Sequence, residues 1–152
     1  MKEPTKLSIF AAMALYDILG KLRMDKDGKE KNYPFLLSYK MQRNKDLLEK
    51  DIYLFSSKRT EVLKDLGIEV QGSQINVPAD KKDQYEKEVS DIGLTQVSHT
   101  FSKFTIDEVM ENFSDAASLT SPEMELFMYS FVDDPELLGE QVAEEEKPEV
   151  WI

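Results

Sequence analysis

An apolar pattern with a helical period opens the chain. Apolar residues recur at spacings of three and four between Ile9 and about Arg23, which predicts a largely buried helix. Ser8 directly precedes this stretch, and a serine at that place accepts a hydrogen bond from a free backbone N–H of the first turn. The polar stretch 24–32 that follows predicts a loop.

A second predicted helix spans residues 34–66. Pro34 suits a first helical position and Gly67 suits the stop. The positions expected to face inward follow a period near 3.6 rather than a strict heptad, which favours packing on a globular body; they are Leu37, Met41, Asn44, Leu48, Ile52, Phe55, Arg59, Val62 and Leu66. At ~1.5 Å per residue the helix is about 50 Å long, longer than a small domain. We therefore expect part of it to project or to pair with a second copy in a homo-oligomer.

Short alternating stretches then predict strands. Residues 68–71 and 74–77 flank Gly72-Ser73, a glycine-first turn typical of a hairpin. A short charged helix is expected over 79–92, and apolar–polar alternation predicts a further strand over 94–103. We expect these three strands to form one small antiparallel sheet covered by helices.

The last third of the chain predicts two more helices and a tail. Thr105 and Thr120 are each followed three residues later by Glu, the capping-box pattern that starts a helix. Residues 124–132 are apolar on nearly every side of a helix. From residue 140 the composition is that of an exposed acidic extension.

The predicted fold is α+β and mostly helical: a helical hairpin with one long helix, a small antiparallel sheet and an acidic C-terminal helical segment. We assign residues 1–104 to a helical-hairpin and small-sheet body. Residues 105–139 form an acidic helical segment packed on or beside that body, and residues 140–152 form an acidic tail.

Charge is distributed very unevenly along the chain. The 152 residues carry a formal net charge of −11. Residues 1–104 hold 16 acidic and 18 basic residues, whereas residues 105–152 hold 14 acidic residues and one basic residue, Lys147. Such a segment either meets a basic partner or keeps molecules apart in solution. The acidity argues against direct binding to nucleic acid or to an anionic membrane, and no apolar run reaches the ~18–20 residues of a membrane span.

Catalytic and metal-binding signatures are absent from the sequence. With no cysteine and a single histidine, His99, the chain offers no thiol chemistry and little for a histidine-based site. No phosphate-binding glycine loop or nucleophile elbow is present. We therefore predict a non-enzymatic protein without cofactor or metal.

Two features favour binding to another protein. Residues 124–132, apolar all round, are either sandwiched in the core or covered by a partner, and methionines and aromatics are typical of adaptable contact surfaces. The acidic tail ends in a lone tryptophan, which resembles a docking peptide with an aromatic anchor. The predicted contact residues are Met124, Phe127, Met128, Phe131, Glu144, Glu145, Glu146 and Trp151.

The order of these parts resembles a loose group of small bacteriophage proteins of unknown function that have a helical hairpin and a short strand region. The resemblance covers residues 6–113. It is carried by Lys6-Leu7-Ser8, Ala14–Leu19, Leu37-Ser38-Tyr39-Lys40 with Arg43-Asn44, Leu66-Gly67, Tyr85–Glu88 and Phe104–Asp107. It implies a phage origin and a role in particle assembly or in handling the host.

We therefore predict a protein-binding accessory or assembly protein of phage origin, acting through its acidic C-terminal third. Its partner is a phage structural protein or a host protein. Its expected location is the cytoplasm of the host cell or the virion. The alternative is an inhibitor that competes with nucleic acid for a host defence or regulatory protein.

Overall fold

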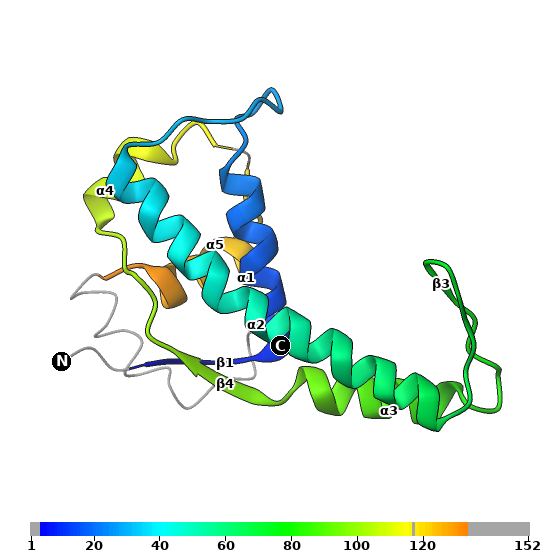
Figure 1. Ribbon diagram of the computed structural model, residues 1–152. Coiled ribbons are helices and arrows are strands. Elements are labelled where there is room, and N and C mark those ends of the chain that lie inside the picture. Colours follow the sequence, from blue (N-terminus) through cyan, green and yellow to red (C-terminus); the bar gives the residue numbers. More distant parts are fainter. Residues whose placement is uncertain (1–3, 117, 134–152) are drawn as a thin grey trace.

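The computed structural model describes residues 4–116 and 118–133. These residues form five helices and two small antiparallel sheets, a mostly helical α+β fold as predicted (Figure 1). The elements in chain order are β1 (Thr5–Ser8), α1 (Ile9–Leu22), α2 (Phe35–Asp65), β2 (Val70–Gln71), β3 (Gln74–Ile75), α3 (Lys82–Gly93), β4 (Gln96–His99), α4 (Ile106–Asn112) and α5 (Ser121–Phe131).

Three helix starts and the end of α2 follow local chemistry, whereas α2 begins at Phe35, with Pro34 just outside it instead of at the predicted first helical position. The Ser8 hydroxyl accepts a hydrogen bond from the Ala11 N–H at 3.0 Å. Thr105 and Thr120 each form a complete capping box with the glutamate three residues later. At the end of α2, Gly67 has a φ of +67° and the Ile68 N–H donates to the Leu63 carbonyl at 2.8 Å, which is a Schellman ending.

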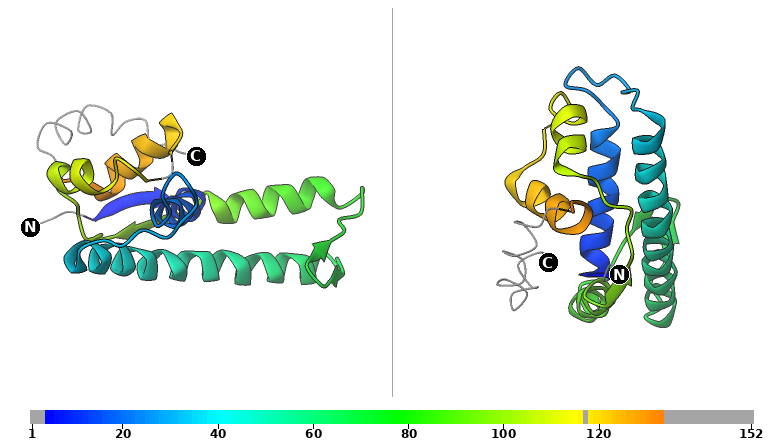
Figure 2. Two further views of the ribbon diagram at one scale, coloured as in Figure 1. Left: turned by 90° about the horizontal axis from the view of Figure 1, so that it is seen from above. Right: turned by 90° about the vertical axis from the view of Figure 1, so that its left-hand side faces the viewer.

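The elements lie in layers with α2 on one outer side. In the left view of Figure 2, α2 runs along one edge, α4 and α5 lie on the opposite side, and α1 with the β1–β4 ribbon lies between them. The C-terminal half of α2 extends beyond this body and is accompanied by α3, with the β2–β3 hairpin at the far end (Figure 1). The helix therefore does project, as its length predicted.

The strand pairing differs from the prediction. The strand β4 pairs antiparallel with β1, Thr5 opposite His99 and Leu7 opposite Val97, whereas the β2–β3 hairpin forms a separate sheet. The predicted single three-stranded sheet is therefore wrong. The segment 5–8 was not expected to be a strand, because four residues leading into a helix are too short to show an alternation.

One hydrophobic core joins the body to the acidic segment. It contains residues of β1, α1 and α2 together with Phe101, Phe104, Ala116 and the inner side of α5. The Phe104 ring packs against the rings of Phe113, Phe127 and Phe131. The described part of the acidic segment therefore packs directly on the body, across the predicted boundary at residue 104.

The inward face of α2 departs from the prediction at two places: Leu63 is buried where Val62 and Leu66 were expected, and Asp51 is buried where Ile52 was expected. Because Asp51 is buried and Ile52 only partly so, the inward stripe over residues 37–55 follows a heptad spacing and not the expected period near 3.6. The reason lies in a distant element: His99 of β4 places Nε2 2.6 Å from Asp51 Oδ2. A buried carboxylate is tolerated where it is paired and hydrogen-bonded.

Candidate protein-binding surface

The structure buries two of the predicted contact residues. Phe127 and Phe131 have exposed fractions of 1% and 0% and belong to the core, so their predicted contact role is wrong. The cause is that α5 packs against α1 and the Phe101–Phe104 segment, which satisfies its aromatic side within the chain. Met128 is partly buried against the same core and Met124 is 44% exposed. The four others, Glu144, Glu145, Glu146 and Trp151, lie outside the described residues.

Part of the acidity of the C-terminal third is matched by lysines of the body. Lys40 lies 2.8 Å from Glu108 and Lys21 lies 2.6 Å from Glu123. Lys31 also pairs with Asp115. These three contacts join α1, α2 and the loop between them to α4, α5 and the loop between those helices. The slightly basic body and the acidic segment are therefore electrostatically complementary parts of one folded unit.

The three carboxyl groups in these pairs have lowered pKa values. A hydrogen bond from Lys31 is the main cause of the lowered pKa of Asp115, and one from Lys21 is the main cause at Glu123. At Glu108 burial acts most strongly and raises the pKa, but hydrogen bonds from Lys40 and from the Thr105 N–H together outweigh it. The charged form of each carboxylate is thus favoured in the folded chain.

We expect acid to remove this contribution to stability. Because the folded pKa values lie below the ordinary ones, the unfolded chain takes up more protons as the pH falls below about 5, and the free energy of unfolding decreases until the folded pKa is passed. The double variant Glu108→Gln with Glu123→Gln keeps the capping-box geometry without the charges. Between pH 7 and pH 3 the free energy of unfolding of this variant should fall by about 1 kcal/mol less than that of the unaltered chain, because ion pairs that are still open to solvent contribute little each. Urea unfolding at each pH measures the free energy of unfolding of the variant and of the unaltered chain. An equal decrease in the two chains would contradict a stabilising role for the ion pairs of Glu108 and Glu123.

A different surface stands out as a place for binding: the outer face of α2. It carries large apolar side chains that are well exposed, with Phe35 at 85%, Tyr53 at 77% and Leu36 at 60%. Tyr39 and Leu54 extend the same face and are exposed as well. Residues 35, 36 and 39 lie within about one turn, and residues 53 and 54 lie about four turns further along the helix, so the two groups share the side of α2 opposite the inward stripe, which we call the outer stripe.

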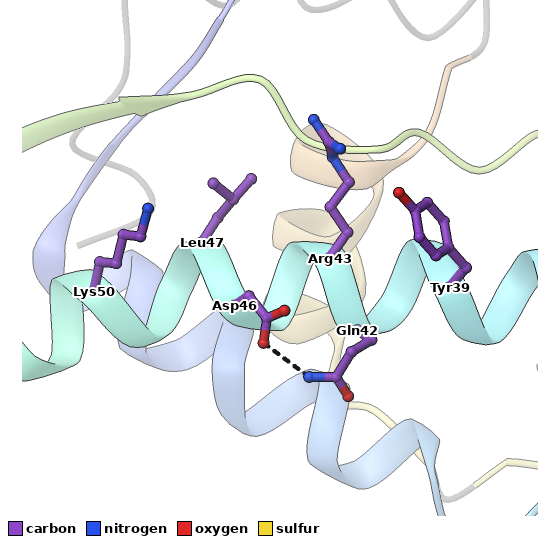
Figure 3. A pocket seen from close by; sticks show the side chains of 6 residues that line it. All are labelled: Tyr39, Gln42, Arg43, Asp46, Leu47 and Lys50. Carbon is purple, nitrogen blue, oxygen red and sulfur yellow. Dashed lines mark hydrogen bonds between the residues drawn. The ribbon is translucent and has the colours of Figure 1, made fainter.

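The middle of this stripe is polar and slightly hollowed. An open pocket of about 350 Å³ lies there, lined by Tyr39, Gln42, Arg43, Asp46, Leu47 and Lys50. Figure 3 shows Arg43 and Lys50 projecting on one side of the helix and Asp46 with Gln42 on the other. Gln42 Nε2 donates to Asp46 Oδ1 at 2.8 Å. Among the described residues, none forms an ion pair with Arg43 or Lys50.

Buried polar contacts on the opposite face hold α2 in place. Asn44, fully buried, donates from Nδ2 to the Ser102 carbonyl at 2.9 Å and accepts from the Ser102 N–H at 2.7 Å. One turn and two turns away, Lys40 contacts Glu108 and Asp51 contacts His99. These contacts fix the rotation of α2 about its axis, so the outer stripe is presented on a rigid element.

The sequence contained a signal for this surface that the inward pattern concealed. Leu36, Tyr39, Tyr53 and Leu54 are apolar yet fall outside the stripe expected to be buried. Large apolar residues on the side of a helix opposite its buried stripe indicate a second packing face.

Other chemistry has little support in the described ranges. In residues 4–116 and 118–133, no group of three or more His, Asp or Glu side chains is placed to hold a metal ion. None of the helices in these ranges combines the length and the apolar character of a membrane span. The arrangement present there, exposed aromatic and aliphatic side chains around a polar centre, is suited to contact with another macromolecule.

The chain matches no family model, no curated protein and no solved structure.

Proposed function

We propose that this chain is a non-enzymatic accessory or assembly protein that binds another protein through the outer face of α2. The observation that carries the proposal is the exposed apolar side chains near the two ends of this face, Phe35, Leu36 and Tyr39 at one end and Tyr53 and Leu54 at the other. Covering a large aromatic or leucine side chain contributes about 1.5–3 kcal/mol, so a partner that covers Phe35, Leu36 and Tyr53 gains substantial free energy. Aromatic side chains are also enriched where binding energy concentrates.

The rigidity of α2 supports the same proposal. Its inward side chains are locked into the core and into hydrogen bonds with Ser102 and His99. A preorganised surface loses less conformational entropy on association than a mobile one. A role in particle assembly, a phage origin and a location in the host cell or the virion rest on the resemblance of residues 6–113 and are part of the proposal.

Site-specific photo-cross-linking tests the proposal. A benzophenone amino acid at Tyr53, and separately at Leu36, should give covalent adducts in extracts of the cells that naturally contain the chain. The same amino acid at Glu86, on the exposed side of α3, is the matched control and should give far less adduct. The mass of each adduct distinguishes a second copy of the chain from a different protein.

The same experiment separates α2 from the acidic tail. If α2 is the contact surface, a chain truncated after Gly139 keeps the Tyr53 adduct. Loss of the adduct on truncation would instead assign binding to residues 140–152, where Trp151 and the three consecutive glutamates lie. No adduct at Tyr53 and Leu36 above the Glu86 level would refute the proposed surface.

A further inference from the structure

We propose that the partner of the α2 outer face is a second copy of the same chain, bound antiparallel with the two-fold axis between positions 44 and 45. This inference rests on the proposed function and names its partner. It follows from the order of side chains along the stripe: when two copies lie antiparallel, each side chain faces one of compatible charge or polarity.

The exposed stripe contains a regular heptad spacing. Six positions follow one another at intervals of three and four residues and lie on the outer face of α2: Leu36, Tyr39, Arg43, Asp46, Lys50 and Tyr53. This spacing is the one that places side chains along the contact line of two paired helices. At ~1.5 Å per residue the stripe is about 26 Å long.

When the α2 helices of two copies lie antiparallel about the centre of the stripe, compatible side chains face each other. In that arrangement Arg43 of one copy faces Asp46 of the other, twice by symmetry. Tyr39 faces Lys50, an aromatic ring opposite an ammonium group, and Leu36 faces Tyr53. A contact through a two-fold axis uses the same patch on both copies, so every pairing occurs twice.

A parallel arrangement does not have this complementarity. Each position would then face itself, so that Arg43, Asp46 and Lys50 would each meet a like charge. Like charges placed opposite each other at a contact disfavour association. An antiparallel pair shifted by one heptad places Arg43 opposite Tyr53 and still pairs Asp46 with Lys50, but it leaves Leu36 opposite Thr60 and loses the apolar contact. The charges therefore select the antiparallel orientation, and the apolar residues at the two ends of the stripe select the register.

The fold leaves this face accessible. In both views of Figure 2, α2 lies along an edge of the molecule, with α1, α4 and α5 on its inner side. Phe35 and Leu54 border the two ends of the stripe and add apolar area to it. Because the centre of the contact is charged and the area is small, we expect a weak dimer with a dissociation constant in the micromolar range.

A charge-exchange series tests the register by sedimentation velocity over about 1 to 500 µM full-length chain. The unaltered chain should dimerise. Arg43→Asp and Asp46→Arg should each raise the dissociation constant by ~10-fold or more through like-charge contacts. The double variant Arg43→Asp with Asp46→Arg should dimerise again, and so should an equimolar mixture of the two single variants. Lys87→Asp, the same change of charge on the exposed side of α3, should leave dimerisation unchanged.

Far-ultraviolet circular dichroism and thermal unfolding of each variant establish that the exposed substitutions leave the fold intact. A chain that stays monomeric over the whole range would overturn the inference. So would dimerisation that survives both single exchanges, or that the double exchange fails to restore. In any of these cases a Tyr53 adduct with a different protein would leave the proposed function standing, whereas absence of that adduct would remove both.

Discussion

Replacing Phe127 with alanine should lower the free energy of unfolding by about 3–5 kcal/mol. The ring is 1% exposed and packs against Phe104, Phe113 and Phe131. Its removal takes away apolar burial and leaves a cavity among rings that cannot all move to fill it, because Phe104 and Phe131 are also tied by a backbone hydrogen bond of 2.7 Å. Urea unfolding followed by circular dichroism measures the change in midpoint and slope.

The matched control is the same substitution at Phe35, which is 85% exposed. Phe35→Ala should change the stability of the monomer by about 0.5 kcal/mol or less, since little burial is lost. The two phenylalanines thus separate folding from the proposed binding: we expect Phe127→Ala to weaken the fold and Phe35→Ala to weaken only the proposed contact with a partner. A Phe127→Ala chain as stable as the unaltered one would contradict the assignment of α5 to the core.

Replacing Asn44 with leucine is the second large effect. Asn44 is fully buried and makes two hydrogen bonds to the backbone of Ser102, as donor to the carbonyl and as acceptor from the N–H. Leucine has the same branched shape but is larger and cannot form hydrogen bonds, so the substitution leaves the Ser102 N–H and carbonyl without their side-chain partner and also crowds a fully buried site. A buried polar group without a partner costs about 1–3 kcal/mol. Because the N–H and the carbonyl of Ser102 both lose their partner, we expect the free energy of unfolding to fall by roughly 2–5 kcal/mol.

Asn76→Leu is the control for this substitution. Asn76 is exposed after β3, and we expect a change within about 0.5 kcal/mol there. Thermal unfolding gives both values under the same conditions. If Asn44→Leu were as stable as Asn76→Leu, the contact between α2 and Ser102 would not contribute to the fold.

Features that depend on a few neighbouring residues were predictable. Ser8, Thr105 and Thr120 cap the helices they were expected to cap, because an N-cap needs only its own side chain and the backbone of the next turn. Gly67 ends α2 because glycine adopts a positive φ without steric cost. Gly72 likewise has a φ of +62° in the hairpin turn.

Features that depend on distant residues were not predictable from local patterns. The strand β1 exists because β4, some ninety residues later, provides its hydrogen-bonding partner. Asp51 faces inward because His99 approaches it across 48 positions of sequence. No window of local periodicity contains either partner, so a buried aspartate and a four-residue strand leave no recognisable signal.

The candidate site also combines features that local sequence predicts with features that depend on distant residues. Composition alone drew attention to the apolar residues 124–132 and the acidic C-terminal third, but composition does not distinguish a helix covered by its own chain from one covered by another. Packing against α1 and Phe104 placed Phe127 and Phe131 inside, and lysines of the body neutralised Glu108 and Glu123.

Local sequence thus set where the helices begin and end and which residues have a helical or strand period, since these properties arise from interactions within one or two turns. The inward stripe of α2 was also predictable, because it is mostly apolar whereas the opposite stripe carries Arg43, Asp46 and Lys50 at its centre. That Asp51 lies inside while Leu36 and Tyr53 stay in solvent was settled by long-range packing, since the contacts that decide it come from other elements. The side on which α1, β4 and α4 pack became the inner face. The stripe from Leu36 to Tyr53 was left in contact with solvent, available to a partner.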